Sequence, residues 1–282
     1  MATISAAQVR ALRDKTNLPM MECKEALSAC DGDEQAAIDW LKKKHKGKME
    51  ERADRQTGEG RIFVYMDEAR KNGAIIDFRC ESAPVAKNSE FLTLGESIVR
   101  QVALQPESRP SSESVLASRV AGDPGKTLQD LLTEVYGRIR ETMKLIACRR
   151  VTGEYLCAYV HHDGKKGVLL ALDAKPAPEA VGLDLCHHVT FTQPLAVTRD
   201  QLPAARVEDV ARLAREVAQA ERKPAQILDK IVQGKVNAFC AENALMDQEH
   251  VKPEYEKKSV AAVLQAAGVK AVTDWACMGI GG

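Results

Sequence analysis

Apolar side chains in the first 45 residues recur at helical spacing, and two breaks divide the pattern into three segments. Ser5 and Gln8 have the spacing of a capping box at the start of the first helix. Asp31-Gly32 ends the second helix, and Asp33 can cap the third. The pattern therefore predicts that residues 1–45 form a compact module of three helices.

Two stretches of alternating apolar residues follow at residues 62–66 and 74–80, and alternation with period two predicts strands. Asn72-Gly73 lies just before the second stretch, where a hairpin turn is expected. The segment 46–60, which separates these strands from the helical module, is charged and polar and is predicted to be a linker.

The next apolar stripe has a helical period and begins near Asn88. Residues 105–126 are rich in Pro, Ser and Gly and are predicted to form a loop. Thr127 can cap a long helix whose apolar positions continue to Met143.

The order strand, strand, helix then occurs a second time. Strands are expected at residues 147–160 and 166–173, with the turn residues Asp163-Gly164 between them, and a helix is expected near 178–190. The pattern predicts two related α+β subdomains with antiparallel sheets.

Residues 204–239 carry two narrow apolar stripes on either side of Arg222-Lys223-Pro224, which predicts an antiparallel helical hairpin with charged outer faces. A helix near 258–267 and a strand-like run at 272–280 follow. The predicted fold class is α+β, with these parts: residues 1–45, three-helix module; 46–60, linker; 61–146, first core subdomain; 147–203 and 240–282, second core subdomain; 204–239, coiled-coil hairpin.

Composition argues against several classes of function. Basic and acidic residues number 40 each, so the net charge of zero gives no electrostatic footprint for nucleic acid. No run of about 20 apolar residues could span a membrane, and Met1–Ser5 lacks the charged and apolar stretches of a signal peptide. The eight cysteines form no CxxC pair, which predicts buried free thiols in a cytoplasmic protein.

Four segments carry recognisable motifs: Arg13–Ile38 around Met20–Leu27, Gly73–Phe91, Tyr159–Leu169 and Lys223–Phe239. In these segments the chain resembles the elongation factor Ts family, and the resemblance extends over nearly its whole length. The resemblance implies a UBA-like N-terminal module, a core of two α+β subdomains, and a coiled-coil hairpin inserted in the second. It also implies a guanine-nucleotide exchange factor that binds elongation factor Tu·GDP and promotes GDP release, with no catalytic residue, cofactor or metal ion.

The resemblance implies that the N-terminal module binds the partner, and Val9, Leu12, Met20 and Met21 are the candidate contacts. Methionine suits such a surface because its side chain is adaptable. For Val9 and Leu12 the alternative is that they fill the core of the three-helix module.

The segment Ser82, Ala83, Pro84 and Val85 is a second candidate contact, and it departs from the family's usual Thr-Asp-Phe-Val. In the family, the Asp and Phe enter between helices of elongation factor Tu and disturb its magnesium site. Ala83 has no carboxylate and Pro84 has no aromatic ring to act as a wedge. The alternative function is therefore a divergent paralogue that binds elongation factor Tu but has weakened exchange activity.

His161 matches a family histidine that touches the partner, and the alternative is an ordinary histidine beside a hairpin turn. The sequence ends at Gly281-Gly282, where family members often continue into a C-terminal helix that touches the partner. A homodimer or a 2:2 complex with elongation factor Tu is left open.

Three other patterns have competing explanations. His161-His162 and Cys186-His187-His188 contain metal-ligand residue types but lack a standard zinc spacing. Gly122–Thr127 ends like a phosphate loop, but the required first glycine is absent and no strand is expected before it. Three-helix modules of this size also bind ubiquitin-like partners, so residues 1–45 alone leave that alternative open.

Overall fold

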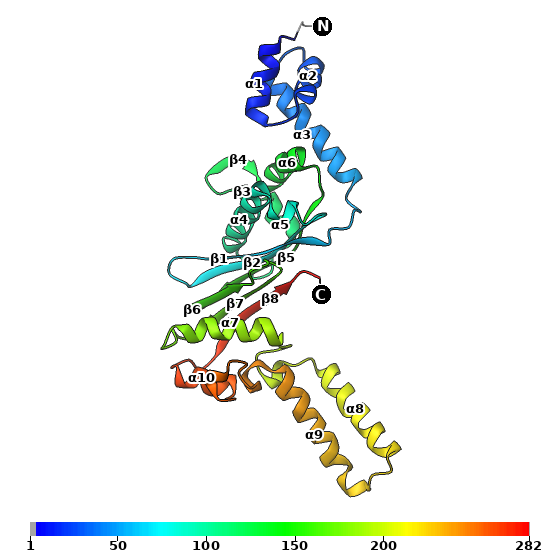
Figure 1. Cartoon of the computed structure of the whole chain (residues 1–282), viewed down its shortest axis with the longest axis vertical. Coiled ribbons are helices and arrows are strands. Elements are labelled where there is room, and N and C mark those ends of the chain that lie inside the picture. Colours follow the sequence, from blue (N-terminus) through cyan, green and yellow to red (C-terminus); the bar gives the residue numbers. More distant parts are fainter. Residues whose placement is uncertain (1–3, 282) are drawn as a thin grey trace.

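In a computed structural model that describes residues 4–281, two three-stranded antiparallel sheets stack at the centre of the molecule (Figure 1). The first sheet has the order β1-β2-β5 and the second the order β6-β7-β8. Apolar side chains of both sheets, including Ile75 and Leu169, form a buried cluster between them. The strands are β1 (Glu59–Met66), β2 (Asn72–Cys80), β5 (Met143–Thr152), β6 (Tyr155–Val160), β7 (Lys166–Leu172) and β8 (Val272–Gly279). Met1–Thr3, part of the stretch considered for a signal peptide, and Gly282 lie outside the described residues.

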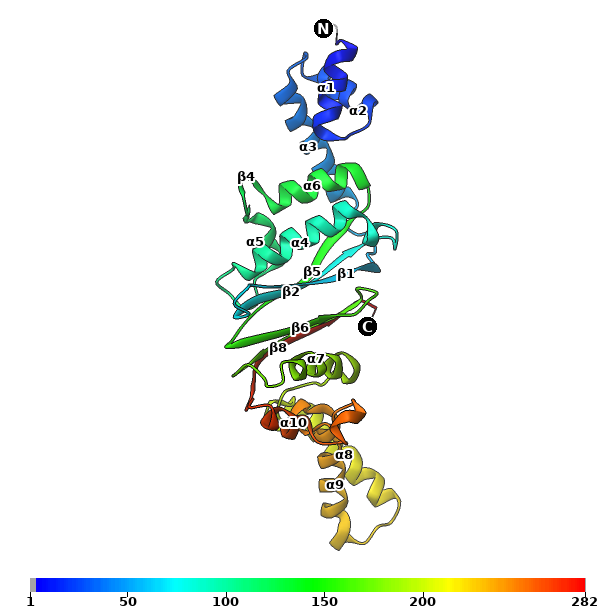
Figure 2. The same ribbon diagram turned by 60° about the vertical axis from the view of Figure 1, so that its left-hand side comes forward.

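Helices cover the outer face of each sheet, so the body has the order helix, sheet, sheet, helix (Figure 2). On the first sheet lie α4 (Ser89–Ala103) and α5 (Ser112–Ala117), with α6 (Leu128–Ile139) packed on both. On the second sheet lies α7 (Ala180–Thr192), and α10 (Val260–Ala266) packs against it. This arrangement confirms the predicted α+β class.

Local capping decides where several helices begin, and the caps at Ser5, Asp33 and Thr127 were predicted from the sequence. Ser5 and Gln8 form the capping box of the first helix, Asp33 caps the third, Asn88 caps α4 and Thr127 caps α6. In each case the side chain of the cap accepts a hydrogen bond from a backbone N–H of the first turn. The helices of the N-terminal module are α1 (Ala6–Thr16), α2 (Met20–Ala29) and α3 (Glu34–Glu51).

The third helix continues beyond the N-terminal module, so residues 46–51 of the expected linker are helical. Met49 packs against the core of the first subdomain, and the Tyr136 hydroxyl donates to the Lys48 carbonyl at 3.3 Å. Contacts with the core therefore stabilise a charged segment whose own sequence carries no apolar stripe.

The turn between β1 and β2 lies at residues 67–71, and not at Asn72-Gly73, which are both within β2. The Asp67 carboxylate accepts hydrogen bonds from the backbone N–H groups of Lys71 and Asn72, at 2.8 and 3.2 Å. Arg70 adopts a positive φ of 52°. An aspartate side chain thus closes a longer turn than the Asn-Gly pair would make.

The segment predicted to be a loop, residues 105–126, contains α5 and a two-stranded ribbon of β3 (Arg119–Val120) and β4 (Asp123–Thr127). Ser111 caps α5, and Val115 is buried in the core of the first subdomain. After this segment, α6 ends at Ile139 and does not extend to Met143, because Arg140 adopts a left-handed conformation with φ of 66°.

The strand expected at residues 147–160 is two strands that belong to different sheets. β5 pairs with β2, whereas β6 pairs with β7. The break includes Gly153, where a Cβ atom would approach the Ala171 Cβ to 2.7 Å. Residues 147–152, assigned from the sequence to the second subdomain, therefore complete the sheet of the first.

An antiparallel helical hairpin projects from the second subdomain, at the opposite end from the N-terminal module (Figure 1). It consists of α8 (Ala204–Ala220) and α9 (Ala225–Asn243), and Arg215 pairs with Asp229 across it at 2.8 Å. Its base is closed by a small apolar cluster that includes Leu202 and Cys240. The return helix ends at Asn243, four residues beyond the predicted residue 239.

The cysteines match their predicted state across residues 4–281. All eight are free thiols, and six of them are buried. In the same part of the chain, no helix is both long enough and apolar enough to cross a membrane.

Candidate partner-binding surface

The loop Ser82–Val85 follows β2 and leads into a short 3₁₀ helix. The Ser82 backbone N–H and hydroxyl both donate to the Glu141 carboxylate, at 3.0 and 2.7 Å. Ala83 and Pro84 are exposed, and Val85 is half-buried against the core of the first subdomain. The loop is therefore held in place at its start and presents two small side chains to solvent.

His161 begins the turn between β6 and β7 and is half-buried. Its Nδ1 atom lies 2.9 Å from the Tyr159 hydroxyl, and its ring centroid lies 4.2 Å from that of His162. His187 of α7 meets the Tyr159 ring edge-on, with centroids 4.3 Å apart. A tyrosine hydroxyl and neighbouring rings therefore fix the orientation of the predicted contact residue.

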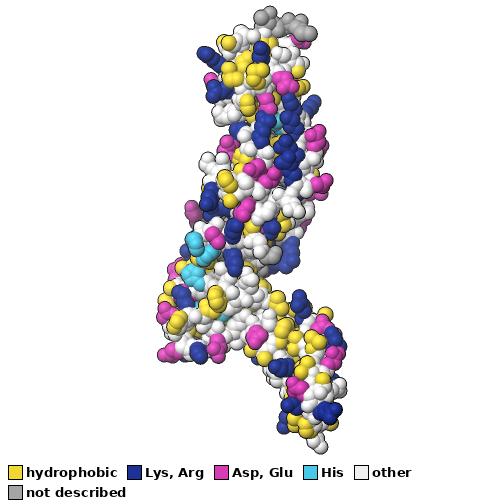
Figure 3. Space-filling model, turned by 45° about the vertical axis from the view of Figure 1, so that its right-hand side comes forward, with side chains coloured by type: hydrophobic (Ala, Val, Ile, Leu, Met, Phe, Trp, Pro, Cys, Tyr) yellow, Lys and Arg dark blue, Asp and Glu magenta, His cyan; other side chains and the backbone are white. Residues whose placement is uncertain are grey.

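Two adjoining clefts bring the predicted loop and the predicted histidine onto one face. A cleft of about 410 Å³ is lined by Ala83 and by the turn residues His162, Asp163 and Lys165. A second cleft of about 640 Å³ shares Asp163 and Lys165 with the first and includes His161. Histidine side chains gather visibly on this side of the body (Figure 3). We call this continuous region the cleft face.

Basic side chains predominate along the cleft face. Arg61, Lys87, Lys165 and Lys166 line it, and Glu59 neutralises Lys165 at 3.0 Å. The Lys165 backbone N–H, followed by the charges of the neighbouring histidines, holds the pKa of Asp163 below its ordinary value. The face is therefore suited to a partner that presents carboxylates.

The four predicted contacts of the N-terminal module divide into two pairs. Val9 and Leu12 are buried in the three-helix core, which is the alternative given for them above. Met20 and Met21 are 38% and 74% exposed at the start of α2. Of the four, the methionines therefore present the apolar surface that a partner can reach.

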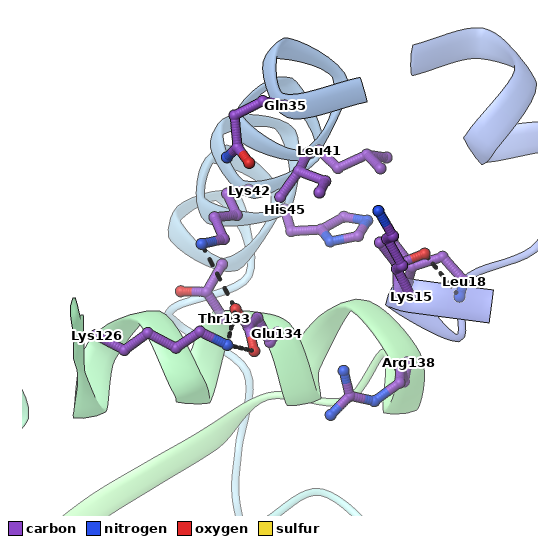
Figure 4. A pocket seen from close by; sticks show the side chains of 12 residues that line it. Lys15, Leu18, Gln35, Leu41, Lys42, His45, Lys126, Thr133, Glu134 and Arg138 are labelled. Atoms are coloured by element: carbon purple, nitrogen blue, oxygen red, sulfur yellow. Dashed lines mark hydrogen bonds and ion pairs between the residues drawn. The ribbon is translucent and has the colours of Figure 1, made fainter. Parts of the chain in front are cut away.

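The N-terminal module meets the core through α3 and α6, and a cleft of about 290 Å³ lies between them (Figure 4). Glu134 pairs with Lys42 of α3 at 3.5 Å and with Lys126 at 3.0 Å. The His45 ring lies against Gly137, where a Cβ atom would come within 2.4 Å of Nδ1. Close packing at a glycine thus sets the distance between the two helices.

Glu22 of α2 forms a second link between module and core. Its carboxylate pairs with Arg140 at 2.6 Å and lies 3.4 Å from the His45 Nε2 atom. Burial alone would raise the pKa of Glu22, but Arg140, with a smaller contribution from His45, outweighs burial and lowers the pKa below its ordinary value. Burial lowers the pKa of His45, so the link at neutral pH is the ion pair of Glu22 with Arg140.

The competing sites take other structural roles. Gly122–Thr127 forms the ribbon turn and β4, and Lys126 is engaged by Glu134, so this segment does not cradle a phosphate. Within the residues that the structure describes, no group of three His, Cys, Asp or Glu side chains is arranged to hold a metal ion. Buried His188 is occupied by hydrogen bonds with Gln248 and with the Val251 N–H.

Comparison with known families agrees with this architecture. A model of the UBA/TS-N domain matches residues 19–41, which places the N-terminal module in that class. A model described as Elongation factor TS matches residues 77–282. The protein is thus a translation factor with a UBA-type module. The chain belongs to the elongation factor Ts family, and its role lies in translation elongation.

Curated relatives named elongation factor Ts align along almost their full length. The protein of Aquifex aeolicus is 36% identical over 273 residues, which cover 94% of this chain and 93% of the relative. The protein of Cytophaga hutchinsonii is 34% identical over 267 residues, with 94% of both chains covered. The protein of Kineococcus radiotolerans is 34% identical over 274 residues, covering 95% of this chain and 96% of the relative.

Several side chains of the cleft face were not predicted from the sequence. Tyr159, His187 and Phe191 are the main ones. A signal for Phe191 was present, since it lies outside the buried stripe of Val181, Leu185 and Val189 and has a threonine on each side. A bulky apolar residue outside the buried face of a helix is a candidate for contact with another molecule.

Proposed function

We propose that this protein binds elongation factor Tu·GDP in the cytoplasm and promotes GDP release as a non-enzymatic guanine-nucleotide exchange factor. The cleft face is the observation that supports this proposal most directly. It unites the Ser82–Val85 loop with His161, the two core segments for which the family resemblance implies partner contact. The exposed methionines of α2 supply a separate contact at the end of the molecule.

Binding energy alone is sufficient for this activity. A GTPase holds GDP through a phosphate-cradling loop and a magnesium ion. A factor that binds best to a conformation with weakened nucleotide contacts lowers the affinity for GDP, and GDP lowers the affinity for the factor by the same ratio. No covalent bond is made or broken, so neither a catalytic residue nor a cofactor is required.

The composition of the Ser82–Val85 loop determines what share of the binding energy the other contacts must supply. Full burial of a phenylalanine side chain contributes up to about 3 kcal/mol, and a proline replaces part of that. Ala83 and Pro84 therefore offer less apolar area than the family's usual residues and no carboxylate. We propose that exchange here relies more on Met20, Met21 and the second subdomain.

The test is the release of a fluorescent GDP analogue from the cognate elongation factor Tu. The wild-type chain is expected to accelerate release over the GTPase alone, and Ala83→Asp/Pro84→Phe is expected to accelerate it further. A chain with a shortened Ser82–Val85 loop measures what the present loop contributes. An unchanged rate in the presence of wild-type chain would refute exchange, and equal rates for all three chains would remove the loop from the mechanism.

A divergent paralogue that binds elongation factor Tu with weakened exchange is the second candidate. The missing carboxylate at Ala83 and the missing aromatic ring at Pro84 favour it. Stable co-elution with the GTPase together with slow GDP release would select this candidate. Light scattering on the same complex distinguishes a 1:1 assembly from the 2:2 assembly, and on the free chain it reveals a homodimer.

A further inference from the structure

Phe191 is 79% exposed, more than any other large apolar side chain in residues 4–281. It lies one residue before the end of α7, whose buried stripe of Val181, Leu185 and Val189 faces the second sheet. Leaving an aromatic ring in water forgoes the free energy of burial, so a ring in this position indicates a surface that another molecule covers.

The surroundings of Phe191 form a defined site. The ring borders the 640 Å³ cleft, beside Tyr159, His187 and Ile280. Tyr159 is held by the 2.9 Å contact with His161 and by the edge-on ring of His187, at an interplanar angle of 85°. A wall that is already ordered loses little conformational entropy on binding, which favours tight contact.

The charges around Phe191 define the partner that would cover it. Across the two adjoining clefts, the charged lining residues are four cations, Arg61, Lys87, Lys165 and Lys166, and two carboxylates, Glu59 and Asp163. The complementary surface is therefore an apolar pocket with carboxylates at its rim. The cleft is continuous with the one that contains Ala83, so a single partner can cover both.

We propose that Phe191 is the aromatic anchor of this chain and inserts into an apolar, acid-rimmed pocket of elongation factor Tu. This inference rests on the proposed function, because it takes the same GTPase as the occupant of the cleft face. Aromatic side chains at the centre of an interface carry a large share of its binding energy. The aromatic ring that Pro84 lacks in the first subdomain is thus present at Phe191 in the second.

The experiment compares the affinity of Phe191→Ala and Leu183→Ala for the nucleotide-free GTPase by calorimetry. Leu183 is the matched control, because it is 46% exposed on the same helix and lines neither cleft. Phe191→Ala is expected to weaken binding roughly 10- to 100-fold, and Leu183→Ala less than about 2-fold. Lys166→Ala is expected to reduce the salt dependence of binding, because it removes a cation from the rim. Circular dichroism melts verify that each variant is folded.

The outcomes separate this inference from the proposed function. If wild type accelerates GDP release and Phe191→Ala binds the GTPase as tightly as wild type and Leu183→Ala do, the anchor is refuted and exchange stands. If wild type neither binds nor accelerates release, both proposals fail. Phe191→Ala could instead change the mass of the free chain measured by light scattering and leave the affinity for the GTPase intact. In that case Phe191 contacts a second copy of this chain, and the anchor is refuted.

Discussion

The two core subdomains share one architecture but use phenylalanine in opposite ways. In the first, Phe63, Phe78 and Phe91 are buried together, and the rings of Phe78 and Phe91 stack at 4.7 Å. In the second, the buried core is mainly aliphatic, and Phe191 lies on the surface. Two halves with the same layers can therefore differ in what their phenylalanines do: those of the first stabilise the fold, and Phe191 of the second is available to a partner.

The two subdomains also differ in the polar groups that they bury. His188 and His250 are buried in the second subdomain, with ring centroids 5.0 Å apart. The buried polar side chains described in the first subdomain are Asp77, Thr133 and Thr142, and none of them is an imidazole. Burial disfavours the protonated form of an imidazole. Low pH should therefore reduce the stability of the second subdomain more than that of the first.

The largest expected effect comes from one substitution made in each subdomain. Phe91→Ala leaves a cavity in the first core and is expected to lower the free energy of unfolding by about 3–5 kcal/mol. Phe191→Ala removes an exposed ring and is expected to change it by less than about 0.5 kcal/mol. Urea denaturation of both variants measures the difference, and equal losses would contradict the contrast between the subdomains.

The next effect is a loss of stability in acid. Burial, and then the neighbouring His188, lower the pKa of His250 from an ordinary 6.5 to about 4, while Asp184 and Glu254 oppose the shift and Lys252 adds to it. Between these pH values the unfolded chain binds more protons than the folded one, so stability is full above pH 6.5 and is lost as pH falls towards 4. The loss from this group is up to about 3 kcal/mol.

The matched variant for this effect is His250→Asn. In the wild-type chain the Lys252 backbone N–H donates to His250 Nδ1 at 3.2 Å. An asparagine side chain can accept the same hydrogen bond and does not titrate. Denaturant unfolding from pH 7 to pH 4 should therefore depend less steeply on pH in the variant. An unchanged slope would assign the acid sensitivity to other groups.

The smallest effect concerns the Ser82–Val85 loop. Glu141→Ala removes the acceptor of two hydrogen bonds from Ser82, and the expected cost is about 1–2 kcal/mol. Hydrogen exchange at the Ser82 amide should rise while exchange in β7 stays constant. If the amide remains equally protected, the loop is held by Pro84 and Val85 and not by Glu141.

Local signals in the sequence were sufficient to locate the caps at Ser5, Asp33 and Thr127, because a cap depends on a few neighbouring residues. The division of the predicted strand at 147–160 was missed, because the choice of sheet depends on pairing with distant residues. The turn at 67–71 was missed because a side chain of Asp67, and not a turn dipeptide, closes it.

The candidate surface was predictable in part. Loop position and the family resemblance indicated Ser82–Val85 and His161, and the structure places both on the cleft face. Helical periodicity showed that Val9 and Leu12 lie on an apolar face but not what that face covers. Phe191 was missed although it lies outside the apolar stripe of α7, because periodicity indicates which face of a helix is buried and not what lies beside the other face.

The continuity of α3 has a consequence for how tightly the whole molecule can hold its partner. This helix has 18 residues, so it is about 27 Å long, and it begins in the N-terminal module and ends on the core. A stiff connection keeps the methionines of α2 at a fixed separation from the cleft face. Once one contact has formed, the other meets its target at a high effective concentration, and two weak contacts then act as one strong one.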